Sequence, residues 1–226
     1  MIGVGGSRSG IGKTTYVSLL LGRLKGWGAI KYTKTEVYCS LTDDPSILSA
    51  AGKDTERMMA AGAERVVWVQ SPPAELAEVL PIAVDRLSDL KGIVVEGNSA
   101  IEFLNPDIIV LLLGDTSGGT KESAERLLRK AHIVVSESGD LDMFSSEAKR
   151  FSRSADEYDG FLGVVMELLE KKENIRASLS ARSVSGKIPC QVAREIAESF
   201  QVPYREVGAV ANEIGVKITA CELGCF

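Results

Sequence analysis

Residues 1–16 read M-I-G-V-G-G-S-R-S-G-I-G-K-T-T-Y, and this stretch decides the fold class. Ile2 to Gly5 form a short apolar run that is typical of a buried strand. A loop rich in glycine and serine follows from Gly6 to Ile11, and Gly12-Lys13-Thr14-Thr15 then opens an amphipathic helical pattern. A strand, a glycine-rich loop and a helix that begins with Gly-Lys-Thr together predict a phosphate-binding loop.

The predicted loop contains the groups that hold the phosphates of a nucleotide. Its glycines allow backbone N–H groups to converge on phosphate oxygens, and the positive end of the helix dipole adds to the attraction. Lys13 is placed to reach the β- and γ-phosphates, and the Thr14 hydroxyl to ligate Mg²⁺. Ser7 stands where the general pattern begins with glycine. The residues predicted to bind the nucleotide here are Ser9, Gly10, Ile11, Gly12, Lys13, Thr14 and Thr15.

Apolar runs and amphipathic segments alternate beyond this loop. The runs are nearly continuous, as expected of parallel strands that are covered on both faces. The amphipathic segments between them are typical of crossover helices. Predicted strands are 2–5, 29–32, 65–70, 92–96, 107–113 and 132–136, and predicted helices are 13–24, 54–61, 74–90 and 121–131. The pattern predicts an α/β fold, namely a three-layer P-loop NTPase with a mostly parallel sheet.

Glu96 is the candidate second ligand of the metal. It closes the apolar run Ile93-Val94-Val95 and is followed by Gly97-Asn98. Because sites in such folds gather at the carboxyl ends of the strands, this carboxylate is predicted to hold Mg²⁺ or to position a water. The alternative is a strand-end glutamate that simply faces water. Lys13 and Glu96 are therefore the predicted catalytic residues.

The alternation of strands and helices ends near residue 137. Residues 144–154 and 158–172 have helical patterns with no strand between them, and the serine-rich stretch 177–186 reads as a linker. The pattern of residues 187–226, the tail of the chain, predicts two short helices joined by a turn and followed by a strand. We therefore expect a nucleotide-binding domain over 1–176, a linker over 177–186 and a small helix-turn-helix-like domain over 187–226.

The amino-acid composition limits the kinds of partner that this chain is expected to bind. Acidic residues outnumber basic ones by 31 to 26 in a chain of 226 residues, and the sequence pI is about 5.2. No general basic field therefore attracts nucleic acid or an anionic membrane. The longest apolar run, Ile108 to Leu113, is far shorter than the ~20 residues that span a bilayer. The N-terminus has no signal-peptide pattern, so we expect a cytoplasmic protein without membrane contact.

Four blocks in the first hundred residues carry a family resemblance. They are residues 9–15, 29–34, 52–63 and 95–97, which read S-G-I-G-K-T-T, A-I-K-Y-T-K, G-K-D-T-E-R-M-M-A-A-G-A and V-E-G. In this order they resemble MobB, the GTP-binding adapter family of molybdopterin-guanine dinucleotide biosynthesis. The third block is more distinctive than the phosphate-binding loop alone.

This resemblance implies a GTP-binding protein that uses Mg²⁺, hydrolyses GTP slowly and forms a homodimer. It implies a role in molybdenum cofactor biosynthesis or metallocentre maturation, with a protein partner in cofactor or metal insertion. It places Asp54 near the nucleotide, and Lys31 and Thr33 on a loop that senses it. The wider group includes the accessory GTPases that load nickel into hydrogenase and urease.

The chain departs from the family pattern at two places. Lys34-Thr35-Glu36 stands where the family has a His-rich stretch, and the segment after Glu96 lacks the usual basic and aromatic residues. A guanine-reading N-K-x-D motif is expected after the late strand, but S-E-S-G-D occupies 136–140. The preference for GTP over ATP therefore depends on the resemblance alone.

Three cysteines near the end of the chain, Cys190, Cys221 and Cys225, form a candidate metal site. Cys190 begins a predicted helix, where the helix dipole lowers a thiol pKa, and the other two have C-x₃-C spacing. Convergence of three thiolates would suit an Fe–S cluster or Zn²⁺. The alternative is that they are small buried apolar residues. The tail is slightly acidic, which favours contact with protein or metal over contact with DNA.

Two other functions remain open from the sequence. A P-loop small-molecule kinase would use ATP and a catalytic base near Glu96 or Asp115. A nucleotide-responsive regulator would bind DNA through its tail, which the acidity of the tail disfavours. In the GTPase interpretation, Arg8 is the candidate arginine that stabilises the transition state.

Overall fold

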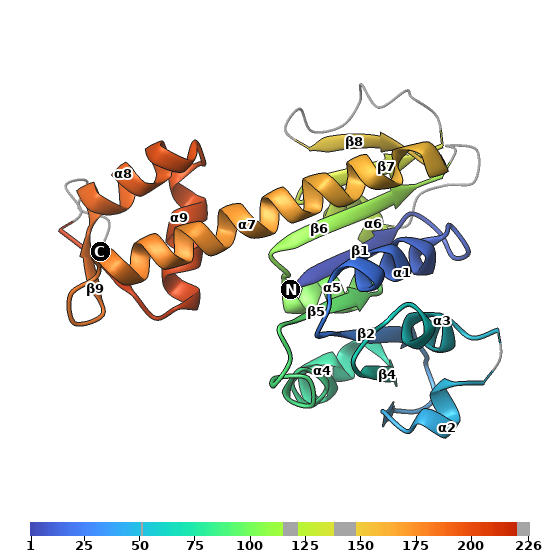
Figure 1. Ribbon diagram of the computed structural model, residues 1–226. Coiled ribbons are helices and arrows are strands. Elements are labelled where there is room, and N and C mark those ends of the chain that lie inside the picture. The colour runs from blue at the N-terminus through green and yellow to red at the C-terminus, as the bar shows by residue number, and fades with distance from the viewer. Residues whose placement is uncertain (51, 115–121, 138–147, 221–226) are drawn as a thin grey trace. The chain divides into compact units, whose positions relative to one another are not determined.

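Eight strands form one sheet in the first part of the chain, in the order β3-β4-β2-β5-β1-β6-β7-β8 (Figure 1). All neighbouring pairs run parallel except β3 and β4, which are antiparallel. The strands are β1 (Ile2–Gly6), β2 (Trp27–Lys34), β3 (Ser40–Thr42), β4 (Val66–Ser71), β5 (Gly92–Glu96), β6 (Ile108–Leu113), β7 (Ile133–Ser136) and β8 (Lys149–Ser152). The predicted, mostly parallel sheet is confirmed.

The computed structural model describes residues 1–50, 52–114, 122–137 and 148–220. The chain divides into two compact units, Met1–Leu162 and Gly163–Phe226. The helical elements of the first unit are α1 (Lys13–Arg23), α2 (Pro45–Leu48), α3 (Asp54–Ala60), η1 (Pro73–Glu75), α4 (Leu76–Asp85), α5 (Asn98–Leu104), α6 (Glu122–Leu128) and η3 (Ala155–Glu157). A longer helix, α7 (Tyr158–Arg182), begins in the first unit and continues into the second.

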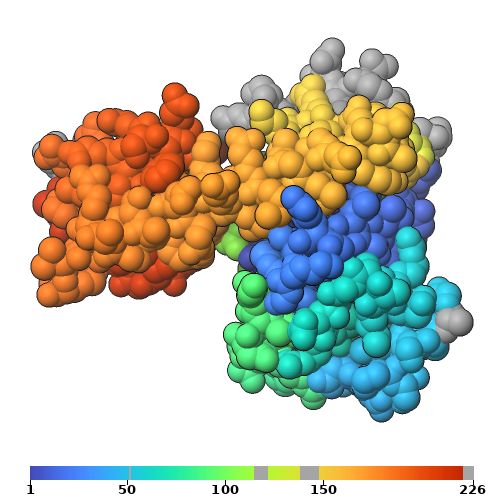
Figure 2. Space-filling model, in the orientation of Figure 1, coloured from blue at the N-terminus to red at the C-terminus, as the bar shows by residue number. Residues whose placement is uncertain are grey.

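Helices cover both faces of the sheet, as its continuous apolar strands require. On one face α1 packs against α3, and in Figure 2 their blue and teal side chains form a continuous layer. On the other face α5 packs between α4 and α6. The expected three-layer α/β architecture is therefore present.

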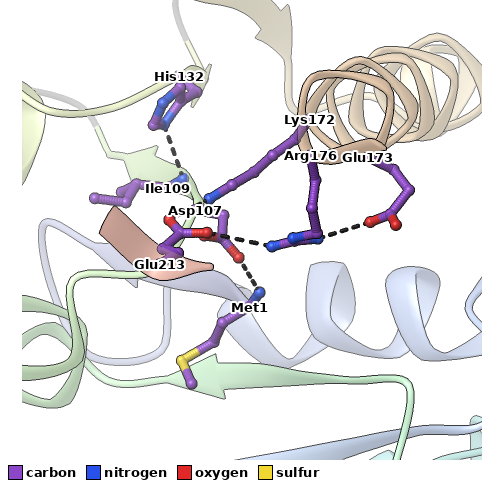
Figure 3. A network of polar contacts seen from close by, with 8 residues as sticks. All are labelled: Met1, Asp107, Ile109, His132, Lys172, Glu173, Arg176 and Glu213. Atoms are coloured by element: carbon purple, nitrogen blue, oxygen red, sulfur yellow. Dashed lines mark hydrogen bonds and ion pairs between the residues drawn. The ribbon is translucent and has the colours of Figure 1, made fainter. Parts of the chain in front are cut away.

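The main core lies between the sheet and the layer of α4, α5 and α6. Leu80, Ile101 and Leu127 from these helices pack there with strand residues such as Ile30 and Leu111, and all five are almost fully buried. Directly before β7, His132 is structural, because its Nδ1 accepts a hydrogen bond from the Ile109 backbone N–H at 3.1 Å (Figure 3).

The helix predicted over 144–154 is wrong for the part that the structure describes. Residues Lys149–Ser152 are the strand β8, which pairs parallel with β7. Phe151 packs edge-on against Phe161, with ring centroids 6.1 Å apart. Strand pairing and this aromatic contact outweigh a local pattern that a four-residue strand is too short to reveal.

The second unit has its own core. Ile175 and Leu179 of α7 pack there with α8 (Cys190–Phe200) and α9 (Tyr204–Glu213). Two short strands, β9 (Lys187–Pro189) and β10 (Lys217–Thr219), pair in parallel. Glu213 accepts from Lys172 at 2.7 Å and from Arg176 at 3.2 Å, which joins α9 to α7 (Figure 3).

The expected linker over 177–186 is wrong for most of its length, because α7 continues to Arg182. The expected boundary at residue 176 also differs from the observed division at Leu162/Gly163. Both errors have one cause. Ile175 and Leu179 are fully buried in the core of the second unit. This burial stabilises the end of α7, which the serine-rich sequence alone does not predict to be helical.

Among the described residues, no helix combines the length and the apolar character needed to cross a membrane.

Phe161→Ala tests how the start of α7 is held. The ring is fully buried and packs edge-on against Tyr16 at a centroid distance of 5.0 Å. We expect the substitution to lower the free energy of unfolding by about 3–5 kcal/mol in urea titrations. Phe103→Ala is the control, because Phe103 is 44% exposed and should cost under about 1 kcal/mol. Equal losses for the two variants would contradict the assignment of Phe161 to the core.

Candidate functional site

The glycine-rich loop lies between the end of β1 and the start of α1. Gly12 is the N-terminal cap of α1 and has φ 91°, a backbone conformation that favours glycine. Within the described residues, no side chain caps this helix and no acidic residue lies in its first turn. The Thr15 N–H donates to the Gly12 carbonyl at 3.0 Å, and the start of the helix, with its positive dipole end, would stabilise an anion.

Hydrogen bonds hold the loop near both of its ends. The Asn98 side chain accepts from the Gly6 N–H at 2.9 Å and donates to the Gly6 carbonyl at 3.0 Å. Near the other end, the Arg153 guanidinium donates to the Ile11 carbonyl at 2.7 Å. Ser7, the departure from the general pattern, accepts from the Gly114 N–H at 3.0 Å. A serine is thus accommodated because its hydroxyl ties the loop to the end of β6.

Four side chains meet beside the first turn of α1. Thr14 Oγ1 lies 2.8 Å from Asp54 Oδ1 and 3.0 Å from Glu96 Oε2. Lys31 Nζ lies 2.5 Å from Asp54 Oδ2 and 2.5 Å from Glu96 Oε1. These residues come from α1, α3, β5 and β2, so this meeting exists only in the folded chain. We call it the acidic cluster.

Glu96 is the most deeply buried member of this cluster. It is 2% exposed and ends β5, directly beside Lys31 on β2 in the register of the two strands. This burial contradicts the alternative of a glutamate that faces water, and the role of Glu96 in holding Mg²⁺ or positioning a water stays a prediction. A buried carboxylate needs charged or hydrogen-bonding partners, and Lys31 and Thr14 provide them.

Asp54 is more exposed, with 42% of its side chain accessible. Its partial burial acts to raise its pKa, but the hydrogen bond and charge of Lys31, aided by Thr14 and Arg57, outweigh that effect. The pKa of Asp54 therefore lies below its usual value of 3.8. Asp54 is ionised at neutral pH.

The acidic cluster suits Mg²⁺. One hydroxyl and two carboxylates are the oxygen ligands that this ion prefers, and Mg²⁺ in proteins usually takes its remaining ligands from water and phosphate. Among the described residues, no group of three or more His, Cys, Asp and Glu side chains could hold a metal ion by itself. The expected ligands Thr14 and Glu96 are brought together, and Asp54 joins them.

Two cavities flank the loop. The larger, of about 1150 Å³, extends from Lys13 over the ends of β2 and β5 to α5 and α6, and its lining includes Lys31, Glu96 and Phe103. The smaller, of about 300 Å³, is lined by loop residues 10–12 with Thr15, Tyr16, Arg153 and Tyr158. The loop therefore has free space on both sides.

Tyr16 forms part of the smaller cavity's wall. Burial, together with the neighbouring Tyr158, raises the pKa of Tyr16 to about 12. Its hydroxyl is buried and has no hydrogen-bond partner among the described residues. A buried hydroxyl without a partner costs free energy, but at 2% exposure Tyr16 does not present it to the cavity.

Sequence reasoning missed several side chains at the loop. Arg57 of α3 donates to the Thr15 hydroxyl at 3.1 Å, and Arg153 follows β8, a strand that the sequence did not predict. The position of Arg57 in the distinctive G-K-D-T-E-R segment could have signalled it. Arg8, the expected arginine, has its Nη2 3.7 Å from Glu137 Oε2.

The three-cysteine site is not supported. Cys190 is half-buried at the start of α8, whereas Cys221 and Cys225 lie outside the described residues. Asp115 and most of 136–140 also lie outside them. A site for an Fe–S cluster or Zn²⁺ therefore remains only a prediction from the sequence.

The sheet, the glycine-rich loop after its central strand β1 and the helix that begins at Lys13 define an α/β fold of the P-loop NTPase class. No protein-family model matches the sequence. No curated protein matches it either.

The solved structures with a similar fold include the following two. One is HypB from Helicobacter pylori in complex with nickel, with 14% identity over 76% of this chain and 87% of that chain and a TM-score of 0.47. The other is LpxK from Aquifex aeolicus in complex with ATP, with 18% identity over 67% of this chain and 52% of that chain and a TM-score of 0.41. Because both TM-scores are below 0.5, neither likeness assigns a family or an activity, and the resemblance to MobB gains no support from them.

Asp54→Asn tests the ionisation of the acidic cluster. Because the pKa of Asp54 is lowered by folding, the ionised form stabilises the fold above about pH 4, and this stabilisation is lost as the pH falls through the folded-state pKa. We expect Asp54→Asn to lower the free energy of unfolding by about 1 kcal/mol or less at pH 7, since the group is partly exposed. The difference between variant and wild type should be smaller at pH 3. Urea titrations at both pH values measure it. Asp85→Asn, at an exposed site, is the control, and a pH-independent difference for Asp54→Asn would contradict the prediction.

Proposed function

We propose that this chain binds a Mg²⁺–nucleoside triphosphate at residues 9–15 and hydrolyses it slowly as a GTP-binding accessory protein. The observation that carries this proposal is the meeting of Thr14, Asp54 and Glu96 beside the helix turn that begins with Lys13. Even with the Lys31 ammonium group between them, the two carboxylates leave one net negative charge beside the anion site, and this charge repels an anion that arrives without a cation. Their presence at this helix start therefore favours a phosphate that arrives with a metal ion.

Each residue has a role in this proposal. The N–H groups of the loop and of the first turn of α1 bind phosphate oxygens, and Lys13 binds the β- and γ-phosphates. Thr14, Asp54 and Glu96 hold Mg²⁺ directly or through water. Bound Mg²⁺ supplies charge stabilisation to the terminal phosphate. Arg57, which donates to Thr15, is placed to add positive charge at the loop.

The smaller cavity is the proposed place for the nucleoside. It lies at the Thr15 side of the loop, whereas the acidic cluster borders the larger cavity. Its volume of about 300 Å³ is at the lower end of the range for ligand sites. The Arg153 guanidinium and the Tyr158 ring offer a hydrogen bond and an aromatic face to a base or ribose.

The finer role follows the resemblance to MobB. In this proposal the chain forms a homodimer and couples its nucleotide state to a protein partner in molybdenum cofactor biosynthesis or metallocentre maturation. A switch of this kind reorders the segments that contact the nucleotide. Lys31, Thr33 and Asp54 lie in such segments and border the larger cavity.

A small-molecule kinase that uses ATP is the second candidate. The observation that favours it is the larger cavity, because about 1150 Å³ beyond Lys13 exceeds what a terminal phosphate needs. An acceptor in this cavity would lie next to Glu96, which could orient its hydroxyl group.

Calorimetry with GTP, ATP and tripolyphosphate in Mg²⁺ tests the site. We expect micromolar binding of GTP, and a loss of at least 100-fold in affinity for all three ligands in Lys13→Ala, because the lysine contacts the phosphates. Arg23→Ala, at the exposed end of the same helix, is the control and should bind like the wild type. Preference for ATP, with turnover only when an acceptor is added, would favour the kinase. No binding of any of the three ligands would refute the proposal.

Arg153→Ala tests the place of the nucleoside separately. We expect GTP affinity to fall about tenfold more than tripolyphosphate affinity, because Arg153 lines the smaller cavity, whereas its hydrogen bond to the Ile11 carbonyl affects both ligands alike. The same calorimetric titrations measure both values, and Arg150→Ala, which changes an exposed residue of the preceding strand β8, is the control. Equal losses for GTP and tripolyphosphate would show that Arg153 acts on the phosphate loop through Ile11 instead.

A further inference from the structure

Lys31 lies at the centre of the acidic cluster. Its ammonium nitrogen is 2.5 Å from one oxygen of Asp54 and 2.5 Å from one oxygen of Glu96. The other oxygen of each carboxylate contacts the Thr14 hydroxyl. A positive group thus bridges the same three side chains that are suited to Mg²⁺.

The acidic cluster has too few hydrogen-bond donors and too little positive charge for its two carboxylates. The Thr14 hydroxyl has one hydrogen, so it cannot donate to Asp54 and Glu96 at the same time. Two carboxylates face a single ammonium group, which leaves the cluster with one net negative charge. A divalent cation would balance the charge of both carboxylates. The Thr14 oxygen could then bind the cation while the Thr14 hydroxyl still donates its hydrogen bond to one carboxylate.

The position of Lys31 in the sheet fixes this contact. β2 lies between β4 and β5, and Lys31 pairs in register with Glu96. The neighbouring residues Ile30 and Tyr32 are buried, and the Lys31 side chain is only 14% exposed. A lysine in an interior strand must keep its charge next to acceptors, and the acidic cluster provides them.

We propose that the Lys31 ammonium group is a built-in counter-cation at the Mg²⁺ position of this site, and that a divalent cation enters by displacing it. The proposal rests on the proposed function, because it takes Thr14, Asp54 and Glu96 as the metal ligands. Lys31 keeps these ligands together before nucleotide arrives. It also competes with free metal, so that metal binding is weak until phosphate oxygens add to the ligands.

The displaced side chain has space to move. Lys31 lines the larger cavity together with Lys13 and Asn98. A rotation about its side-chain bonds would carry the ammonium group from the carboxylates into this cavity. There it would lie next to the place proposed for the terminal phosphate, where a positive charge is favourable.

Binding of Mn²⁺ without nucleotide, followed by electron paramagnetic resonance of the free ion, tests this inference. We expect Lys31→Met to bind one Mn²⁺ at least tenfold more tightly than the wild type, because the competing charge is gone. Lys31→Arg keeps the charge and should stay within threefold of the wild type. Lys34→Met removes an exposed lysine on the same strand, paired with Glu36, and should also match the wild type. Equal affinity of the wild type and Lys31→Met would overturn the inference.

Thermal unfolding gives a second measurement. Lys31→Met should melt at a lower temperature than the wild type in EDTA and regain most of the loss in Mn²⁺, whereas Lys34→Met should show no such recovery. If Lys31→Met does not fold in EDTA, Lys31→Gln, which keeps a hydrogen-bond donor, carries the same expectation. Failure of both to fold even in excess Mn²⁺ would overturn the inference, since the metal could not replace the ammonium group. Because no nucleotide is present, these results are independent of whether GTP or ATP binds.

Discussion

A buried carboxylate, Glu96, is the constraint around which the site of this protein is built. Its place at the end of β5 leaves it 2% exposed, where an isolated negative charge would be unstable. The parallel register of β2 and β5 puts Lys31 beside it, and the start of α1 brings Thr14 within 3.0 Å. The partners of Glu96 thus come from the sheet and from the helix that follows the loop, and Asp54 of α3 contacts both partners.

The same convergence explains why the two sides of the loop differ. Toward β2 and β5 the loop faces charged groups and a large cavity, and toward β8 it faces aromatic rings and Arg153. A nucleoside triphosphate has the same asymmetry, because one end carries several negative charges and the other is a flat ring system. The arrangement of polar and aromatic groups follows that of the proposed ligand.

Local patterns predicted much of the site, and tertiary contacts determined the rest. The loop around Lys13 has a sequence pattern that depends on residue spacing alone, and Glu96 follows an apolar run, so both could be found. The bridging position of Lys31 depends on strand order, which a single sequence does not reveal. Likewise, β8 and the end of α7 owe their structure to tertiary partners outside their own segments, namely β7 and the core formed with α8 and α9. Arg153 was missed because the strand before it was missed.

The two fastenings of the loop have a thermodynamic consequence. Asn98 grips Gly6 through both its amide atoms, and Arg153 grips the Ile11 carbonyl. The loop therefore gives up its conformational entropy when the chain folds and not when a ligand binds. A preorganised loop binds an anion more tightly than a flexible loop with identical contacts, because binding no longer includes the cost of ordering the backbone.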